Sequence, residues 1–83
     1  MYYVYLIQSL TTGKSYVGFT SKSPDIRIKE HNGGSNSFTG SGKPWKLVYY
    51  ESFLCVSCAR LRERFLKTGV GKKLVKLIIE HYK

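Results

Sequence analysis

Acidic residues are scarce in this chain. Its 83 residues include fourteen lysines and arginines but only five carboxylates, which are Asp25, Glu30, Glu51, Glu63 and Glu80. A centre in which several carboxylates bridge two metal ions is therefore not expected. If a metal binds, we expect a single ion that is held by one carboxylate and several water molecules, the arrangement that Mg²⁺ prefers.

Long apolar segments are also absent. No segment approaches the roughly 18 apolar residues that a membrane helix needs, so we expect no membrane span. The N-terminus is apolar from Met1 to Ile7, but it has no basic segment and no small-residue cleavage site. We therefore expect no signal peptide.

Only two cysteines are present, Cys55 and Cys58, three positions apart. A zinc site would need a second pair of ligands with suitable spacing, and a thioredoxin-like redox motif would need a β-α-β context that this chain lacks. We therefore expect reduced thiols and a cytoplasmic location.

Positive charge is what the chain has in excess. The formal net charge is +9 at pH 7, on a chain long enough for a single domain over residues 1–83 with a modest core. This excess of positive charge favours a polyanionic partner. We expect that partner to be DNA rather than a membrane, and RNA stays open. The alternative is a soluble, highly charged surface without such a partner.

The pattern of apolar residues and turn signals predicts an α/β (α+β) fold with the element order β-β-α-β-α-α. Ser23-Pro24-Asp25 is typical of a helix start, and Asn32-Gly33-Gly34 of a helix end. The other elements, in chain order, are strands at 2–9 and 14–19, a flexible polar loop at 34–42, a strand at 45–53, a helix at 55–68 closed by Gly69, and a helix at 72–82.

Two tyrosine triplets lie close together near the start of the chain, Tyr3-Val4-Tyr5 and Tyr16-Val17-Gly18, with a turn at Thr11-Thr12-Gly13 between them. An even-numbered hairpin loop pairs Tyr5 with Gly18 and Ile7 with Tyr16, which puts both phenols on one face. Gly18 then leaves open space beside the Tyr5 ring. An odd-numbered loop puts the phenols on opposite faces.

Two further segments carry side chains suited to phosphate chemistry. Arg27 and His31 lie one turn apart on the first predicted helix, which is typical of a phosphate site but also of a solvated charged face. Glu63 lies at the margin of a basic helix, where a salt bridge to Lys67 is the structural alternative. Glu51, on the third strand, is a weaker rival for a metal.

Together these residues resemble the GIY-YIG nuclease domain. Tyr3-Val4-Tyr5 matches the first triplet with Tyr3 in place of glycine, and Tyr16-Val17-Gly18 matches the second. Arg27 with His31 matches the family's helix, and Glu63 within Arg62-Glu63-Arg64-Phe65-Leu66-Lys67 matches its metal-binding glutamate. The resemblance covers almost the whole chain and is closest to small single-domain members, similar to the nuclease domain of the excinuclease C subunit.

The resemblance implies a three-stranded antiparallel sheet flanked by about three helices, and a site that uses one Mg²⁺ or Mn²⁺ ion. It implies that Glu63 holds the metal and that Arg27 stabilises the phosphate. His31 positions water or phosphate, or assists proton transfer. Tyr5 or Tyr16 accepts a proton from the attacking water. A phenol has an ordinary pKa near 10, so we expect nearby cations to depress it.

By the same resemblance the chain is expected to be a metal-dependent endonuclease or nickase of DNA. We expect it to be directed by the structure of the DNA rather than its sequence, with a role in repair or recombination. The lysines expected to contact nucleic acid are Lys22, Lys43, Lys46, Lys67 and Lys72. Two alternatives stay open, a binding module that does not cut and an adaptor of a repair protein. The expected state is a monomer or weak homodimer.

Overall fold

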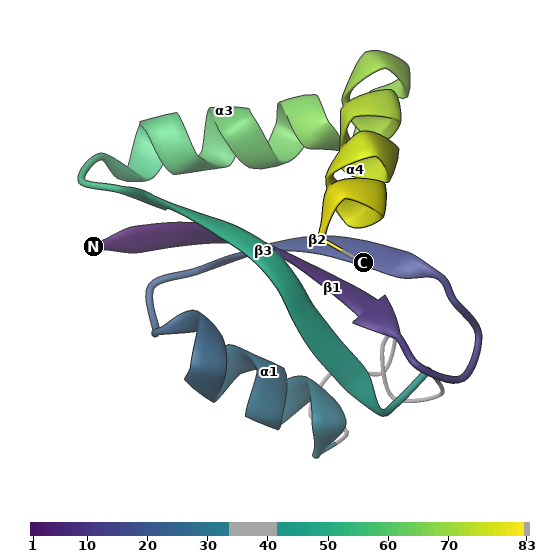
Figure 1. The fold of residues 1–83 in the computed structure, drawn as a ribbon. Coiled ribbons are helices and arrows are strands. Elements are labelled where there is room, and N and C mark those ends of the chain that lie inside the picture. Colours follow the sequence, from purple (N-terminus) through teal and green to yellow (C-terminus); the bar gives the residue numbers. More distant parts are fainter. Residues whose placement is uncertain (34–41, 83) are drawn as a thin grey trace.

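The computed structural model describes residues 1–33 and 42–82 and has the expected α+β architecture (Figure 1). Three strands form one antiparallel sheet in the order β2-β1-β3. The elements are β1 (Tyr2–Ser9), β2 (Ser15–Thr20), α1 (Pro24–Asn32), β3 (Trp45–Phe53), α3 (Val56–Leu66) and α4 (Gly69–His81). The predicted fold class and element order are confirmed, whereas the predicted loop at 34–42 lies almost wholly outside the described residues.

The helices cover both faces of the sheet. Figure 1 shows α1 on one face and α3 with α4 on the other. Because side chains alternate along a strand, β1 supplies both cores. Val4 and Leu6 pack with Ala59 and other residues of α3 and α4. Tyr5 and Ile7 pack with Trp45 on the face of α1.

Local caps explain where the helices begin. The side chain of Ser23 accepts a hydrogen bond from the Ile26 amide, so α1 starts at Pro24 as the sequence predicts. The α4 helix, in contrast, starts three residues before the predicted position, because the hydroxyl of Thr68 accepts a hydrogen bond from the Gly71 amide at 3.1 Å. Gly69 therefore opens α4 rather than closing the preceding helix, which ends at Leu66.

No helix in the described part of the chain combines the length and the apolar character needed to cross a membrane.

Candidate active site

The hairpin of β1 and β2 has the even-numbered loop that puts both tyrosines on one face. Leu10 to Gly13 form the four-residue loop, and Gly13 has a φ of 76°, in the region that favours glycine. Tyr5 pairs with Gly18, and Ile7 with Tyr16. The two tyrosine rings lie 6.5 Å apart between centroids.

The space that Gly18 leaves is filled by Tyr5. A Cβ atom at position 18 would overlap the Tyr5 hydroxyl, and it would lie 2.8 Å from Cε1 of the ring. The Tyr5 side chain therefore reaches over β2 at its glycine, with its hydroxyl above Gly18. Tyr5 as a whole is only 2% exposed.

The α1 helix brings His31 against this hydroxyl. His31 is completely buried, and its Nε2 lies 2.7 Å from the Tyr5 hydroxyl oxygen. Its ring centroid lies 5.7 Å from that of Tyr5 and 5.5 Å from that of Tyr16. The interpretation of this helix side as a merely solvated face is therefore wrong for His31.

Arg27 lies one turn before His31 and is half-buried. Its Nη1 donates a hydrogen bond to Glu30 at 3.0 Å, and Lys22 binds the other oxygen of the same carboxylate at 2.6 Å. The guanidinium also acts on the Tyr5 hydroxyl, whose pKa it lowers. Glu30 thus holds two cations beside the tyrosine.

Glu63 reaches the same place from the opposite face, on α3. Its carboxylate accepts a hydrogen bond from Lys67 at 3.1 Å, so the salt bridge that the sequence offers as an alternative does form. Its charge nevertheless acts on Tyr5, whose pKa it helps to raise. The Lys67 ammonium in turn lies 5.7 Å from the centre of the Tyr16 ring. Tyr5, Tyr16, Arg27 and His31 thus lie together beside β2, and Glu63 is linked to them through its charge and through Lys67.

The pKa of Tyr5 shifts opposite to the expected direction. Burial raises the pKa of Tyr5 to about 12, and the neighbouring Arg27 offsets only part of this effect. Burial, together with the Arg27 charge, also lowers the pKa of His31, so its neutral form is favoured near pH 7. Tyr5 therefore needs a proton acceptor beside it if it is to act as a base, and His31 is in that position.

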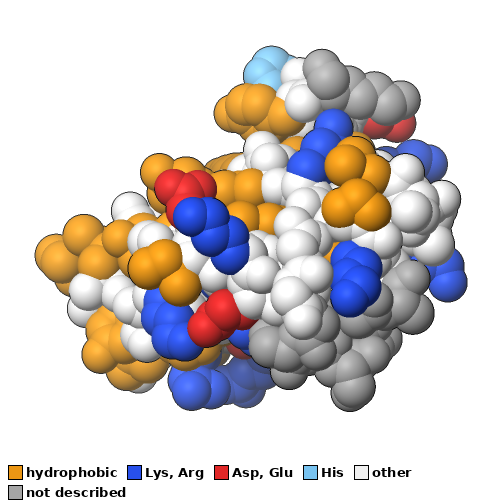
Figure 2. Space-filling view, turned by 90° about the horizontal axis from the view of Figure 1, so that it is seen from below, with side chains coloured by type: hydrophobic (Ala, Val, Ile, Leu, Met, Phe, Trp, Pro, Cys, Tyr) orange, Lys and Arg blue, Asp and Glu red, His pale blue; other side chains and the backbone are white. Residues whose placement is uncertain are grey.

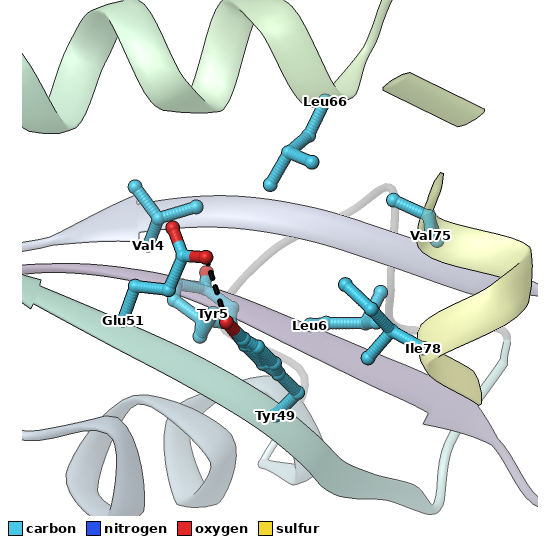
Figure 3. A pocket seen from close by; sticks show the side chains of 8 residues that line it. All are labelled: Val4, Tyr5, Leu6, Tyr49, Glu51, Leu66, Val75 and Ile78. Atoms are coloured by element: carbon cyan, nitrogen blue, oxygen red, sulfur yellow. Dashed lines mark hydrogen bonds between the residues drawn. The ribbon is translucent and has the colours of Figure 1, made fainter. Parts of the chain in front are cut away.

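The rival carboxylate, Glu51, is engaged elsewhere. Arg62 donates two hydrogen bonds to it, at 2.9 and 3.0 Å, and the Tyr49 hydroxyl donates a third at 2.7 Å. Burial alone would raise the pKa of Glu51, but these hydrogen bonds outweigh it and hold the pKa below its ordinary value. Figure 3 shows Glu51 and Tyr49 at a cavity of about 10 Å³, at the lower limit for one water molecule.

This arrangement of Glu51 was not visible in the sequence. Its Arg62 partner lies eleven positions away, beyond the turn between β3 and α3. Nothing local to either residue indicates that they meet.

The predicted lysines fall into two groups. Lys22 and Lys67 form ion pairs with Glu30 and Glu63, whereas Lys43, Lys46 and Lys72 are exposed and have no ion pair with any residue in ranges 1–33 and 42–82. Lys67 and Lys72 line a cleft of about 370 Å³ that also contains Tyr16. On the face seen from the α1 side, basic side chains are spread among hydrophobic ones (Figure 2).

Glu63 is the residue best placed to hold a divalent ion. Among the described residues, no three side chains of histidine, cysteine, aspartate or glutamate come together as a ligand set. A single carboxylate, 21% exposed, could hold an ion that keeps several of its waters. Cys55 and Cys58 are both exposed free thiols.

Comparison with known proteins gives the same family as the motifs. A family model described as the GIY-YIG catalytic domain matches residues 1–76. Two curated relatives, each named UPF0213 protein and from two strains of Staphylococcus epidermidis, are 31% identical to this chain over 80 residues. This alignment covers 95% of the chain and 95% of each relative. No solved structure matches the chain significantly.

Proposed function

The chain belongs to the GIY-YIG family, and from this premise we propose that it is a divalent-metal-dependent endonuclease that hydrolyses phosphodiester bonds in DNA. The observation that supports the proposal is the cluster of Tyr5, Tyr16, Arg27 and His31 beside β2, with the Glu63 carboxylate close enough for its charge to act on Tyr5. A nuclease fold with these groups dispersed would not support it.

In this proposal, the Glu63 carboxylate holds a single Mg²⁺ or Mn²⁺ ion. When bound there, the ion would stabilise negative charge on the phosphate and on the leaving oxygen. Lys67 must leave the Glu63 carboxylate for this to happen. Because a surface ion pair one helical turn apart is worth only about 0.3–0.5 kcal/mol, its opening costs little.

Arg27 binds the scissile phosphate. Its planar guanidinium donates several hydrogen bonds in a fixed geometry, and these strengthen as charge develops on the phosphate oxygens. Glu30 already holds one nitrogen of this group and so limits its orientations.

Tyr5 and His31 act together as the base. The Tyr5 hydroxyl passes its proton to Nε2 of neutral His31 while it accepts a proton from the attacking water. The phenolate then never has to accumulate, which matters because the pKa of Tyr5 is raised to about 12. Tyr16 packs against the His31 ring and positions the water and the phosphate.

The experiment that tests the proposal measures cleavage of supercoiled and branched DNA with Mg²⁺ or Mn²⁺. Replacing Glu63→Gln should lower the rate by about a hundredfold or more, because the lost charge stabilisation is worth several kcal/mol. Glu80→Gln, an exposed carboxylate on α4, is the matched control and should cut like the wild type. Equal rates for wild type and Glu63→Gln would sink the proposal.

A second function is favoured by two observations at the site. The raised pKa of Tyr5 and the Lys67 ammonium on Glu63 both suit a module that binds nucleic acid without cutting it. This function predicts binding that falls steeply with salt and survives Glu63→Gln, with no hydrolysis of any substrate.

The biological setting is part of the same proposal. We expect structure-directed cleavage during DNA repair, in the cytoplasm, by a monomer or weak homodimer that a repair protein can recruit. No side chain of the site is arranged to read base edges, so backbone and shape recognition are the expected mode.

A further inference from the structure

A groove runs along the free edge of the sheet, away from the site at β2. The sheet order leaves β3 as an edge strand, and within ranges 1–33 and 42–82 Figure 1 shows no helix across its outer edge. The groove has a volume of about 390 Å³ and is lined by Leu47, Val48, Tyr49, Tyr50 and Tyr82. Neither the family assignment nor the proposed catalytic residues account for it.

Two half-exposed tyrosines stand in this groove in fixed orientations. Tyr50 is 53% exposed, and its ring packs edge-on against Tyr3 with centroids 6.0 Å apart. Tyr82 is 58% exposed and packs edge-on against Tyr49 at 5.9 Å. Because neighbouring rings already orient them, these tyrosines lose little conformational freedom when a flat ligand stacks on them.

The groove at β3 is separated from the site at β2 only by β1. Tyr50 is the register partner of Tyr5, so the two side chains leave adjacent strands on the same face of the sheet. Lys46, on β3 beside Leu47, is exposed and pairs with no acidic group within the described residues. An aromatic surface beside an exposed cation is the combination that binds single-stranded nucleic acid.

Two features argue against other occupants. The register of β3 slips opposite Leu6 and Ile7, so Val48, within the groove, has no partner residue in β1. Such a bulge opposes the regular addition of another strand at this edge. A second copy of the chain would bring another net charge of +9 to the same surface.

We infer that this groove binds an unpaired nucleobase of the substrate, which stacks on the exposed ring of Tyr50, while Tyr82 lines the groove from the α4 side of β3. The inference rests on the proposed function, since it assumes a nucleic-acid substrate. It supplies a physical basis for structure-directed cleavage, because a base held in a duplex cannot enter the groove. The enzyme should therefore prefer substrates with unpaired nucleotides near the scissile bond.

The test is binding without cleavage, in EDTA, with a single-stranded thymidine oligonucleotide that carries one 2-aminopurine. Wild type should bind it and quench its fluorescence by stacking. Tyr50→Ala should lose about 5- to 150-fold in affinity together with the quenching, and Tyr82→Ala should change in the same direction. Tyr50→Phe keeps the ring and should retain both. Leu77→Ala, an exposed apolar residue of α4, is the control and should match the wild type.

A duplex of equal length provides the second arm. Wild type should bind it more weakly than the single strand, and Tyr50→Ala should remove most of this difference. Unchanged affinity and quenching in Tyr50→Ala would overturn the inference. So would self-association of the wild type that the same substitution abolishes, since the groove would then bind a second copy. This experiment measures binding and not cleavage, so its result does not depend on whether the enzyme cuts DNA. If the enzyme cuts but no base stacks on Tyr50, only the inference about the groove fails.

Discussion

Gly18 is the residue on which the geometry of the proposed site depends. Any side chain there would meet the Tyr5 hydroxyl, which would have to move away from β2. His31 would then lose its hydrogen-bond partner at 2.7 Å. The glycine of the second triplet is thus explained by the position of the tyrosine of the first.

Replacing Gly18→Ala should therefore destabilise the protein and impair the site together. Overpacking of this kind costs about 1–3 kcal/mol, which denaturant unfolding measures as a lower midpoint. Cleavage should fall further than the folded fraction does, because Tyr5 is displaced. Gly69→Ala is the matched control, since a Cβ atom there meets nothing within 4 Å. Unfolding and cleavage that are unchanged in Gly18→Ala would contradict this account of the site.

How far the residues of the site could be predicted depends on how local each contact is. The pairing of Tyr5 with Gly18 followed from counting along one hairpin, given an even loop. Arg27 and His31 followed from helical spacing. The raised pKa of Tyr5 could not be predicted, because it depends on burial under α1. The sequence shows only that cations are plentiful, and not that burial outweighs them.

At the scale of elements, the rotation of α3 decides whether Glu63 faces the site. Adjacent residues on a helix point about 100° apart, so a contact that fixes Arg62 also fixes Glu63. Arg62 is held by two hydrogen bonds to Glu51 on β3. The sequence predicted the helix and the strand, but not this contact. The predicted start of α4 at residue 72 was wrong, because the Thr68 side chain caps the helix three residues earlier.

Replacing Arg62→Met should loosen the orientation of α3 around Glu63, while Ala59 and Leu66 keep the helix packed on the sheet. The lost hydrogen bonds are partly exposed, so the expected cost is about 1–2 kcal/mol in unfolding free energy. Mn²⁺ affinity at Glu63, measured by calorimetry without DNA, should fall as well. Arg62→Lys, which keeps the charge, should recover part of both. Arg60→Met removes a charge that lies over Phe19 and is the control for charge alone. A variant Arg62→Met that loses stability but binds Mn²⁺ normally would limit the contact to a structural role.

At the scale of the whole molecule, the net charge of +9 overstates how many cationic side chains are available to bind phosphate. Lys22 and Lys67 are already paired with Glu30 and Glu63, whereas Lys43, Lys46 and Lys72 are exposed without an ion pair in the described part of the chain. The total charge was available from the sequence. The division of the lysines was not, because the pairing of Lys22 depends on how α1 packs.

This division predicts which lysines control the salt dependence of DNA binding. Each phosphate contact contributes about −0.9 to the slope of log affinity against log salt concentration on duplex DNA. Lys46→Ala and Lys72→Ala should each make the slope about 0.9 shallower, in EDTA between 50 and 200 mM salt, because each removes one released counterion. Lys22→Ala should leave the slope nearly unchanged, since its ammonium already has a carboxylate partner 2.6 Å away. If Lys22→Ala flattened the slope as much as Lys72→Ala does, Glu30 would have to release Lys22 on binding. The ion pair would then be part of the DNA interface rather than a support for Arg27.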